Sequence, residues 1–325
     1  MKRVAALSVV AAVVMLGGCE RARPVASGGK LRVVASIFPL ADVTRRIGGE
    51  FVEVDCLLRA GESPHDYEPR AEQAEAVAGA RLLVMVGLGI DEWAARAAGV
   101  ARSKDVVILK VAEDPAFKKL FASRLRPDTE GEEEAERHHA PDSAPAAGRR
   151  EHERLVADPH VWLDPVFMQQ FVREIAEALA AADPAHKDDY FKNRDDYLAK
   201  LKELDEEYRR TLAPHKGQGF VMFHAAFAYV AERYGLRQEA LYTAEAEGFG
   251  GDRLEKVIRF VKDNKVKAIF AEPQFPKEQL EELARLTGTR VGQLDDQGNP
   301  YVKGYDSYLG MMTSNLAALA AGLKE

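Results

Sequence analysis

The sequence predicts an α/β protein with two similar lobes, each built on a parallel four-stranded sheet flanked by helices. Two observations predict this class. Short apolar runs alternate with helical patterns in both halves of the chain, and one long charged helix lies between the halves. The 325 residues suffice for two domains of about 150 residues each. No residue-level repeat relates the halves, so the expected similarity is one of architecture.

The first half predicts four strands with helices between them. Its apolar runs are short and separated by helical patterns, which indicates a parallel sheet; the first run is nearly continuous and the second alternates in part. The expected strands are 31–37, 51–58, 81–86 and 105–111, and the expected helices are 38–48, 70–80 and a short helix that Asp91 caps.

Two helices in the middle of the chain begin with an aspartate followed by a proline. Asp164 with Pro165, and Asp183 with Pro184, each place a helix N-cap before a proline at the first helical position. The second helix continues to about Leu212, roughly 42 Å at 1.5 Å per residue. Because it is heavily charged with only a thin apolar seam, we expect a rigid spine that joins two lobes with separate apolar cores.

The second half repeats the alternation of strands and helices, so a second sheet is expected beyond the spine. Its strands are expected at 219–223, 236–242, 266–271 and 290–293, with 307–323 as the closing helix. The expected domains are an N-terminal lobe (31–183), a connecting helix (184–213) and a C-terminal lobe (214–325), which face each other across a cleft.

The N-terminus predicts an exported lipoprotein. Residues 1–19 combine a short positive region with an apolar run that is too short to span a bilayer, as in a signal peptide. The run ends in Leu16-Gly17-Gly18-Cys19, which resembles the bacterial lipobox, whose cysteine receives lipid. An ordinary signal peptide with an incidental cysteine is the alternative. Residues 20–30 would be a linker, and we expect a periplasmic or cell-surface protein anchored to a bacterial membrane.

Composition and charge restrict the classes of partner. With 46% hydrophobic and 30% charged residues, the chain has the composition of a soluble globular protein. Its formal net charge of −7 argues against nucleic acid as a partner and against broad adhesion to anionic lipid. The expected oligomeric state is a monomer.

Residues 127–156 interrupt the alternation of strands and helices. Acidic and small residues dominate this segment, and no apolar periodicity survives in it. We therefore expect a flexible surface loop. His138, His139 and His152 would make it an auxiliary metal-binding loop, and the alternative is a solvated acidic insertion.

Three histidines and an aspartate lie where ligands are expected in this fold class, because open parallel sheets bind ligands beyond the carboxyl ends of their strands. His65 lies beyond the second expected strand, and His160 lies between two prolines just ahead of a helix. His224 follows the strand 219–223, and Asp295 follows the last strand. All four are expected at one edge, two from each lobe. Three imidazoles and one carboxylate form a tetrahedral Zn²⁺ site.

Two other carboxylates compete with Asp295 for the fourth place. Asp296 is its neighbour in the sequence, and Glu272 also stands at a strand end. We rank Asp295 first as a ligand and expect Glu272 to orient a ligand from behind.

Several segments match motifs of one known family. They are Pro64-His65-Asp66-Tyr67-Glu68-Pro69, Gly87-Leu88-Gly89 with Glu92-Trp93, Asp158-Pro159-His160-Val161-Trp162-Leu163-Asp164-Pro165, Phe223-His224-Ala225-Ala226-Phe227, Tyr234-Gly235-Leu236, Ala271-Glu272-Pro273-Gln274-Phe275 and Leu294-Asp295. The chain thereby resembles the zinc- and manganese-binding lipoproteins of ABC importers, the cluster A-I solute-binding proteins. The resemblance covers residues 31–323.

The resemblance implies two lobes joined by a rigid helix, with metal in the cleft and delivery to an importer's permease and ATPase. His65, His160, His224 and Asp295 match the family's four ligand positions. Two departures from the family pattern concern these positions. Ala225 stands where relatives often have an acidic residue, and Asp296-Gln297-Gly298 replaces the more usual Pro-Leu-Gly after the last ligand.

Ligand chemistry favours Zn²⁺ over Mn²⁺. Three neutral imidazoles and one carboxylate suit Zn²⁺, whereas manganese importers of the family tend to have a carboxylate where His224 stands. We expect a high-affinity zinc receptor, with a manganese or dual receptor as the alternative. An enzyme is not expected, because the chain has no His-Glu-x-x-His or Gly-x-Ser-x-Gly motif. A zinc hydrolase with Glu272 as base and a metal-stabilised adhesin are the less favoured readings.

Overall fold

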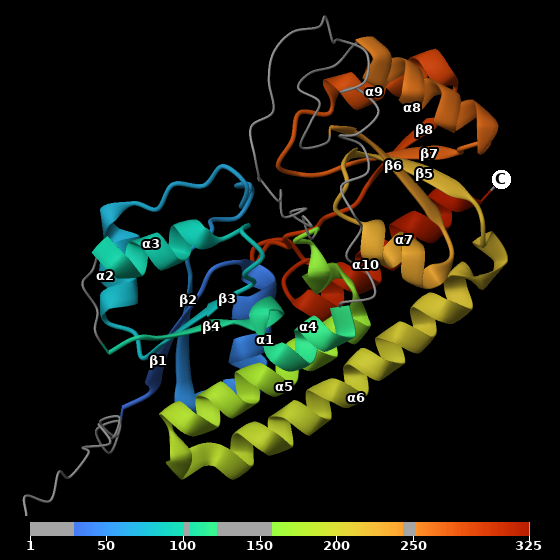
Figure 1. Cartoon of the computed structure of the whole chain (residues 1–325). Helices are drawn as coiled ribbons and strands as arrows, with labels where there is room; N and C mark the ends of the chain where they lie inside the picture. The colour runs from blue at the N-terminus through green and yellow to red at the C-terminus, as the bar shows by residue number, and fades with distance from the viewer. Residues whose placement is uncertain (1–28, 101–104, 122–157, 243–250, 325) are drawn as a thin grey trace, which may run out of the picture.

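The structure, a computed structural model, describes residues 29–100, 105–121, 158–242 and 251–324. It confirms the predicted class, because two parallel four-stranded sheets flanked by helices are joined by one long helix (Figure 1). The strand orders are β2-β1-β3-β4 and β6-β5-β7-β8, so the two sheets have the same connectivity. The similarity of the lobes is therefore architectural, as expected.

The first sheet is assembled from the apolar runs of the N-terminal half. β1 pairs in parallel with β2 and β3, and its Ala35 lies opposite both Cys56 and Val84. All of β1 except Arg32 is buried, which is why its apolar run is nearly continuous. The strands are β1 (Leu31–Ala35), β2 (Val52–Cys56), β3 (Leu82–Met85) and β4 (Val107–Lys110), and the helices are α1 (Phe38–Gly48), α2 (Ala71–Ala78), α3 (Glu92–Val100) and α4 (Pro115–Phe121).

The side chain of Asp91 was expected to cap a helix, but it has a different role. Its carboxylate is fully buried and accepts hydrogen bonds from Ser36 Oγ at 2.6 Å, Val86 N at 2.6 Å and Gly87 N at 3.0 Å. It therefore joins the carboxyl ends of β1 and β3, where the loops of the first lobe begin.

The second sheet follows the same plan. Every residue of β5 except its last, His224, is buried, and β5 pairs in parallel with β6 and β7. Helix α7 is capped at its C-terminal end by Gly235, whose φ of 74° lies in the left-handed region that glycine adopts without strain. The strands are β5 (Gly219–His224), β6 (Arg237–Tyr242), β7 (Ala268–Ala271) and β8 (Arg290–Gln293), and the helices are α7 (Ala228–Tyr234), α8 (Gly251–Asp263), α9 (Glu278–Thr287) and α10 (Tyr308–Leu323).

An antiparallel pair of helices, α5 (Pro165–Ala182) and α6 (Lys187–Leu212), runs along one side of the molecule (Figure 1). α5 begins as predicted, because the Asp164 carboxylate accepts hydrogen bonds from Val166 N and Phe167 N. Asp183 does not act as a matching cap, since its carboxylate instead bonds the Tyr190 hydroxyl and contacts His186 Nδ1. A short 3₁₀ turn, Pro184–His186, therefore precedes α6.

One apolar core runs through both lobes. The larger cluster of buried side chains surrounds β1 and β3, continues through α5 and α6, and reaches Phe220 and Phe270 of the second sheet. A separate, smaller cluster that includes Val221 and Ile269 packs on the other face of that sheet. The expectation of one core per lobe is wrong, because the apolar seam of α6 is buried and connects them. The lobes are thus joined by packing as well as by the chain.

Some predictions concern residues that the structure does not describe. The signal peptide (1–19), Cys19, most of the linker (20–30) and the loop 127–156 with His138, His139 and His152 all lie outside the described residues. Within the described part of the chain, no helix combines the length and the apolarity needed to cross a membrane.

Candidate metal centre

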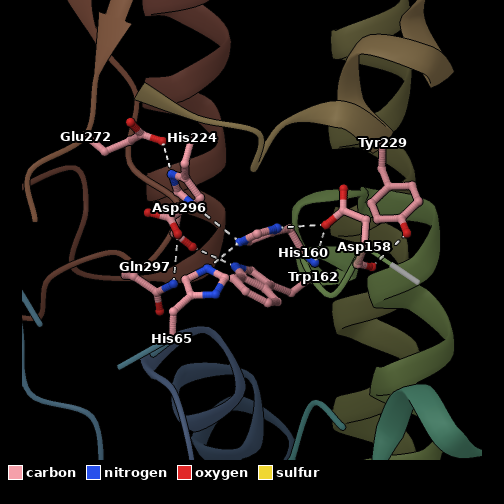
Figure 2. A network of polar contacts seen from close by, with 9 residues as sticks. All are labelled: His65, Asp158, His160, Trp162, His224, Tyr229, Glu272, Asp296 and Gln297. Atoms are coloured by element: carbon pink, nitrogen blue, oxygen red, sulfur yellow. Dashed lines mark hydrogen bonds and ion pairs between the residues drawn. The ribbon is translucent and has the colours of Figure 1, made fainter. Parts of the chain in front are cut away.

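Three histidines from distant parts of the sequence meet where the two lobes face each other (Figure 2). His65 lies in the loop between β2 and α2, and His160 directly precedes the 3₁₀ helix η4 (Val161–Leu163). His224 is the last residue of β5. The fold therefore brings together the three histidines that were predicted as ligands.

The spacing of the three rings suits one metal ion. Nε2 of His160 lies 3.1 Å from Nε2 of His65 and 3.2 Å from Nε2 of His224. Nitrogens that share a tetrahedral Zn²⁺ at about 2.05 Å are about 3.3 Å apart. Among the described residues, these three form the group whose candidate ligand atoms all lie within 4.8 Å of one another.

His160 is held by a carboxylate two residues before it. Asp158 Oδ1 accepts a hydrogen bond from the backbone N–H of His160 at 3.0 Å and lies 2.7 Å from its Nδ1. When Nδ1 donates to this carboxylate, the lone pair of Nε2 is left to face the cleft. Asp158 was not among the predicted site residues. Its place beside His160 in a proline-restrained turn is the signal that indicates it.

His224 is backed by a carboxylate that follows the neighbouring strand β7. Oε1 of Glu272 lies 2.5 Å from Nδ1 of His224, and Glu272 is almost fully buried. Burial raises the pKa of Glu272 to about 7, although the contact with His224 opposes the rise. Burial alone would lower the pKa of His224, but the hydrogen bond and charge of Glu272 outweigh it and raise that pKa. Because Nδ1 of His224 faces this carboxylate, its Nε2 is left to bind metal.

His65 has a different environment from the other two histidines. The residue as a whole is exposed, and among the described residues no carboxylate is paired with its ring. The ring itself packs against His160 and His224, and burial together with their charge lowers its pKa to about 4. Its loop is held within the first lobe, because Trp93 Nε1 donates to the carbonyl of Pro64 at 2.9 Å.

The carboxylate of Asp295 does not join the three rings. Its Oδ1 accepts hydrogen bonds from the backbone N–H groups of Gln297 at 2.9 Å and Gly298 at 2.7 Å, which closes the turn after β8. The side chain of Asn315 on α10 bonds both its backbone N–H and its carbonyl. Burial raises the pKa of Asp295 to about 6, while the N–H group of Gly298 opposes the rise. Its role as a ligand stays a prediction.

Asp296 is the carboxylate of this turn that lies beside the rings (Figure 2). It is fully buried, and its charge adds to the raised pKa of His224 and partly opposes the lowering of the pKa of His65. Gln274 Nε2 donates to its Oδ1 at 2.5 Å, and Gln297 Nε2 donates to its Oδ2 at 2.9 Å. Trp162 Nε1 donates to its backbone carbonyl at 2.6 Å. Both carboxylate oxygens keep lone pairs that a cation can use.

The histidine cluster is distinct from a cavity of about 750 Å³ that the same turn helps to line. That cavity is bounded by Phe38, Arg45, Arg59 and Tyr301 among others, and its walls include none of the three histidines. The converging nitrogens of the cluster suit a single cation.

Comparisons with known proteins agree with this geometry. Residues 33–322 match the family model described as ZnuA, zinc-uptake complex component A, periplasmic. The zinc-binding lipoprotein AdcA of Streptococcus pneumoniae is 29% identical over 324 residues, which cover 98% of this chain and 60% of AdcA. The chain thus spans about 60% of the length of that curated relative.

Solved structures have the same fold. A crystal structure of ZnuA matches with a TM-score of 0.72 and 25% identity, over 91% of this chain and 100% of that one. A deletion mutant of ZnuA with zinc bound matches with a TM-score of 0.72 and 26% identity, over 91% of this chain and 99% of the other.

Proposed function

The chain belongs to the family of periplasmic zinc-uptake component A proteins, and from that premise we propose that it is an extracytoplasmic receptor that captures Zn²⁺ and delivers it to an ABC importer. The family is one of transport components and not of enzymes. The observation that carries the proposal is the convergence of three histidine Nε2 atoms from both lobes.

The proposed ligands are His65, His160 and His224, with a carboxylate of the turn after β8 as the fourth donor. Both carboxylates already accept hydrogen bonds, from two glutamine side chains at Asp296 and from two backbone N–H groups at Asp295. What supports Asp296 ahead of Asp295 for that place is that its charge acts on the rings of His65 and His224. Glu272 is proposed to orient His224. Replacing each aspartate by asparagine tests the choice, and we expect Asp296→Asn to cost more zinc affinity than Asp295→Asn.

Zinc is the proposed cargo because of the donor set. Three neutral imidazoles with one carboxylate match a borderline-soft cation that prefers four ligands, and Mn²⁺ prefers more oxygen donors. AdcA is described as zinc-binding, and a ZnuA structure holds zinc. A manganese or dual receptor of the same kind is the alternative that the competition experiment below tests.

The proposed location is outside the cytoplasm, with residues 1–19 as signal peptide and lipid on Cys19 as the membrane anchor. AdcA is described as a lipoprotein, and the family description is periplasmic.

The proposed partners are the importer's permease and ATPase, and the receptor is proposed to be a monomer. The proposed lobes are 31–183 and 214–325, joined by 184–213, with His138, His139 and His152 of the loop 127–156 as auxiliary metal-binding residues.

Metal analysis tests the proposal most simply. Protein from residue 21 onward is expected to bind one tight equivalent of Zn²⁺ and to prefer it over Mn²⁺ in a direct competition. A further, weaker equivalent that disappears when 127–156 is removed would come from the loop. Replacing His215, whose Nδ1 faces Gln218 away from the cluster, gives a matched histidine control that should bind zinc normally. Preference for Mn²⁺ over Zn²⁺ would contradict the zinc assignment.

Metal removal separates a receptor from a protein that needs zinc to fold. The shared apolar core does not depend on the three histidines, so the metal-free protein should stay folded and should lose only the stability that binding adds. Cooperative unfolding on chelation at 25 °C would favour a structural metal site. Hydrolase turnover that His160→Ala abolishes would favour the enzyme alternative.

A further inference from the structure

Helix α7 of the second lobe holds both ends of the segment that carries His160. The hydroxyl of Tyr229 donates to the backbone carbonyl of Asp158 at 2.7 Å (Figure 2). Nε of Arg233 donates to Oδ2 of Asp164 at 2.5 Å. Tyr229 and Arg233 are four residues apart and therefore lie on the same face of the helix. His160 lies between the two points that they hold.

The link through Arg233 is a buried ion pair. The side chain of Asp164 is 0% exposed and that of Arg233 is 13% exposed. The other Asp164 oxygen caps α5 through Val166 N and Phe167 N, and the guanidinium of Arg233 lies 5.3 Å from the Phe167 ring centroid. Because a buried carboxylate without its partner is strongly unfavourable, this contact fixes where the His160 segment meets α5.

Other contacts bind the same segment to the second lobe. Trp162 Nε1 donates to the carbonyl of Asp296 at 2.6 Å, and the Tyr308 hydroxyl of α10 donates to the carbonyl of Trp162 at 2.8 Å. α7 itself follows β5, which ends at His224. The β5–α7 unit therefore carries one predicted ligand and holds the segment of another, although His160 precedes α6 in the sequence.

We propose that Tyr229 and Arg233 are positioning residues for metal binding, which fix His160 relative to His224. The two histidines then form one rigid pair that contacts from the second lobe hold in place, whereas the contacts that restrain the His65 loop come from the first lobe. This inference rests on the proposed metal site for its purpose. Its geometric part, that α7 holds the His160 segment, is testable without metal.

A pair of tyrosine variants on the same helix tests the first contact. Tyr229→Phe removes the hydroxyl but keeps the ring contacts with Phe121 and Phe167. Tyr234→Phe removes the hydroxyl that donates to Asp205 on α6, away from the site. We expect Tyr229→Phe to weaken zinc binding by about 10-fold, as other supports of metal ligands do, and Tyr234→Phe to leave it unchanged. Equal affinities in the two variants would overturn the proposal.

A second pair of variants separates positioning from stability. Arg233→Met leaves Asp164 buried without its partner, so it should lower both the unfolding temperature and the zinc affinity. Adding Asp164→Asn removes the unpaired charge and keeps a residue that caps helices well. We expect the double variant to regain stability but to bind zinc at least about 10-fold more weakly than the wild type. Zinc affinity that returns together with stability would show a purely structural role.

Hydrogen exchange of the metal-free protein distinguishes failure of this inference from failure of the proposed function. The amides of His160, Leu163 and Asp164 are hydrogen-bonded within the segment. They should exchange faster in Tyr229→Phe than in the wild type, while amides of the His65 loop should not change. Unchanged exchange at these amides would overturn the inference that α7 holds the His160 segment. If the wild type binds no zinc, but these amides exchange faster in Tyr229→Phe than in the wild type, only the proposed function is overturned.

Discussion

The loop that carries His65 and the segment that carries His160 hold their histidines in different ways. His65 is exposed, and the contacts that restrain its loop come from the first lobe, such as Trp93 to the Pro64 carbonyl. His160 is 5% exposed and backed by Asp158, and its segment is bonded to the second lobe. The difference teaches that the contacts that hold a ligand in place can come from the lobe on the other side of the connecting helix.

The largest expected effect comes from the more firmly held ligand. His160→Ala should weaken zinc binding by more than about 100-fold, which exceeds the usual loss when only a support of a ligand is removed. The unfolding temperature of the metal-free protein should change by less than about 3 °C, because the links of the segment to the second lobe do not involve the ring. Chelator competition and calorimetry measure the two quantities.

A smaller loss of zinc affinity is expected from His65→Ala, and this variant tests whether the two regions differ as described. His160, His224 and a carboxylate should still hold zinc, because their supports do not depend on the His65 loop. We expect a loss of affinity that is smaller than in His160→Ala by about 10-fold, on the scale that supports of a ligand contribute. A loss of zinc affinity in His65→Ala that equals or exceeds the loss in His160→Ala would show that the more firmly held histidine is not the more important ligand.

Replacing the carboxylates behind the rings should lower zinc affinity by less than His160→Ala does. Asp158→Asn and Glu272→Gln each remove a charged acceptor from Nδ1 of a ligand and should cost about 10- to 100-fold in zinc affinity. Asp183→Asn, which alters the contact of a histidine outside the site, is a matched control for both. A normal zinc affinity in Asp158→Asn would show that the turn alone holds His160.

Acidification gives a smaller, graded effect with a definite sign. An imidazole must be neutral to bind metal, so affinity falls as pH drops through its pKa. The pKa of His224 is raised and that of His65 is lowered to about 4, so His224 takes up a proton first as the pH falls, and His65 takes part only near pH 4. Zinc affinity should fall by up to about 10-fold per pH unit between pH 7.5 and 5.5 for each proton taken up.

Glu272→Gln provides the internal control for that pH dependence. The variant removes the charge that raises the pKa of His224, while burial still lowers it. The decline in affinity that His224 causes should therefore move to lower pH. A zinc affinity that stays constant between pH 7.5 and 5.5 in the wild type would contradict a ligand role for His224.

Most of the fold was predictable from the sequence because its strands are short, apolar and regularly spaced. The alternation of strands and helices predicted both sheets, and the aspartate before Pro165 predicted the start of α5. The shared core was not predicted, because the thin seam of α6 does not reveal what packs on it from both sides. The same limit applies to Asp183, whose carboxylate is taken by Tyr190.

The residue types that form the site were predictable from the sequence, whereas the role of each residue was less so. Histidines at strand ends and turns are visible in a sequence, and all three meet in the structure. Which of two adjacent aspartates faces them depends on the direction of each side chain in one turn, where the Asp295 carboxylate accepts hydrogen bonds from the backbone N–H groups of Gln297 and Gly298. The clamp of α7 on the His160 segment is a contact between residues about 70 positions apart, and no local pattern announces it.

X-ray absorption at the zinc edge tests the central claim most directly. Protein from residue 21 onward, loaded with one equivalent of Zn²⁺, should show about four nitrogen or oxygen donors at about 2.0–2.1 Å, with the scattering of three imidazoles. The spectrum should lose one imidazole in His160→Ala and stay unchanged in His215→Ala. A zinc shell with fewer than three imidazoles in the wild type, or one that His160→Ala leaves unaltered, would contradict the three-histidine site.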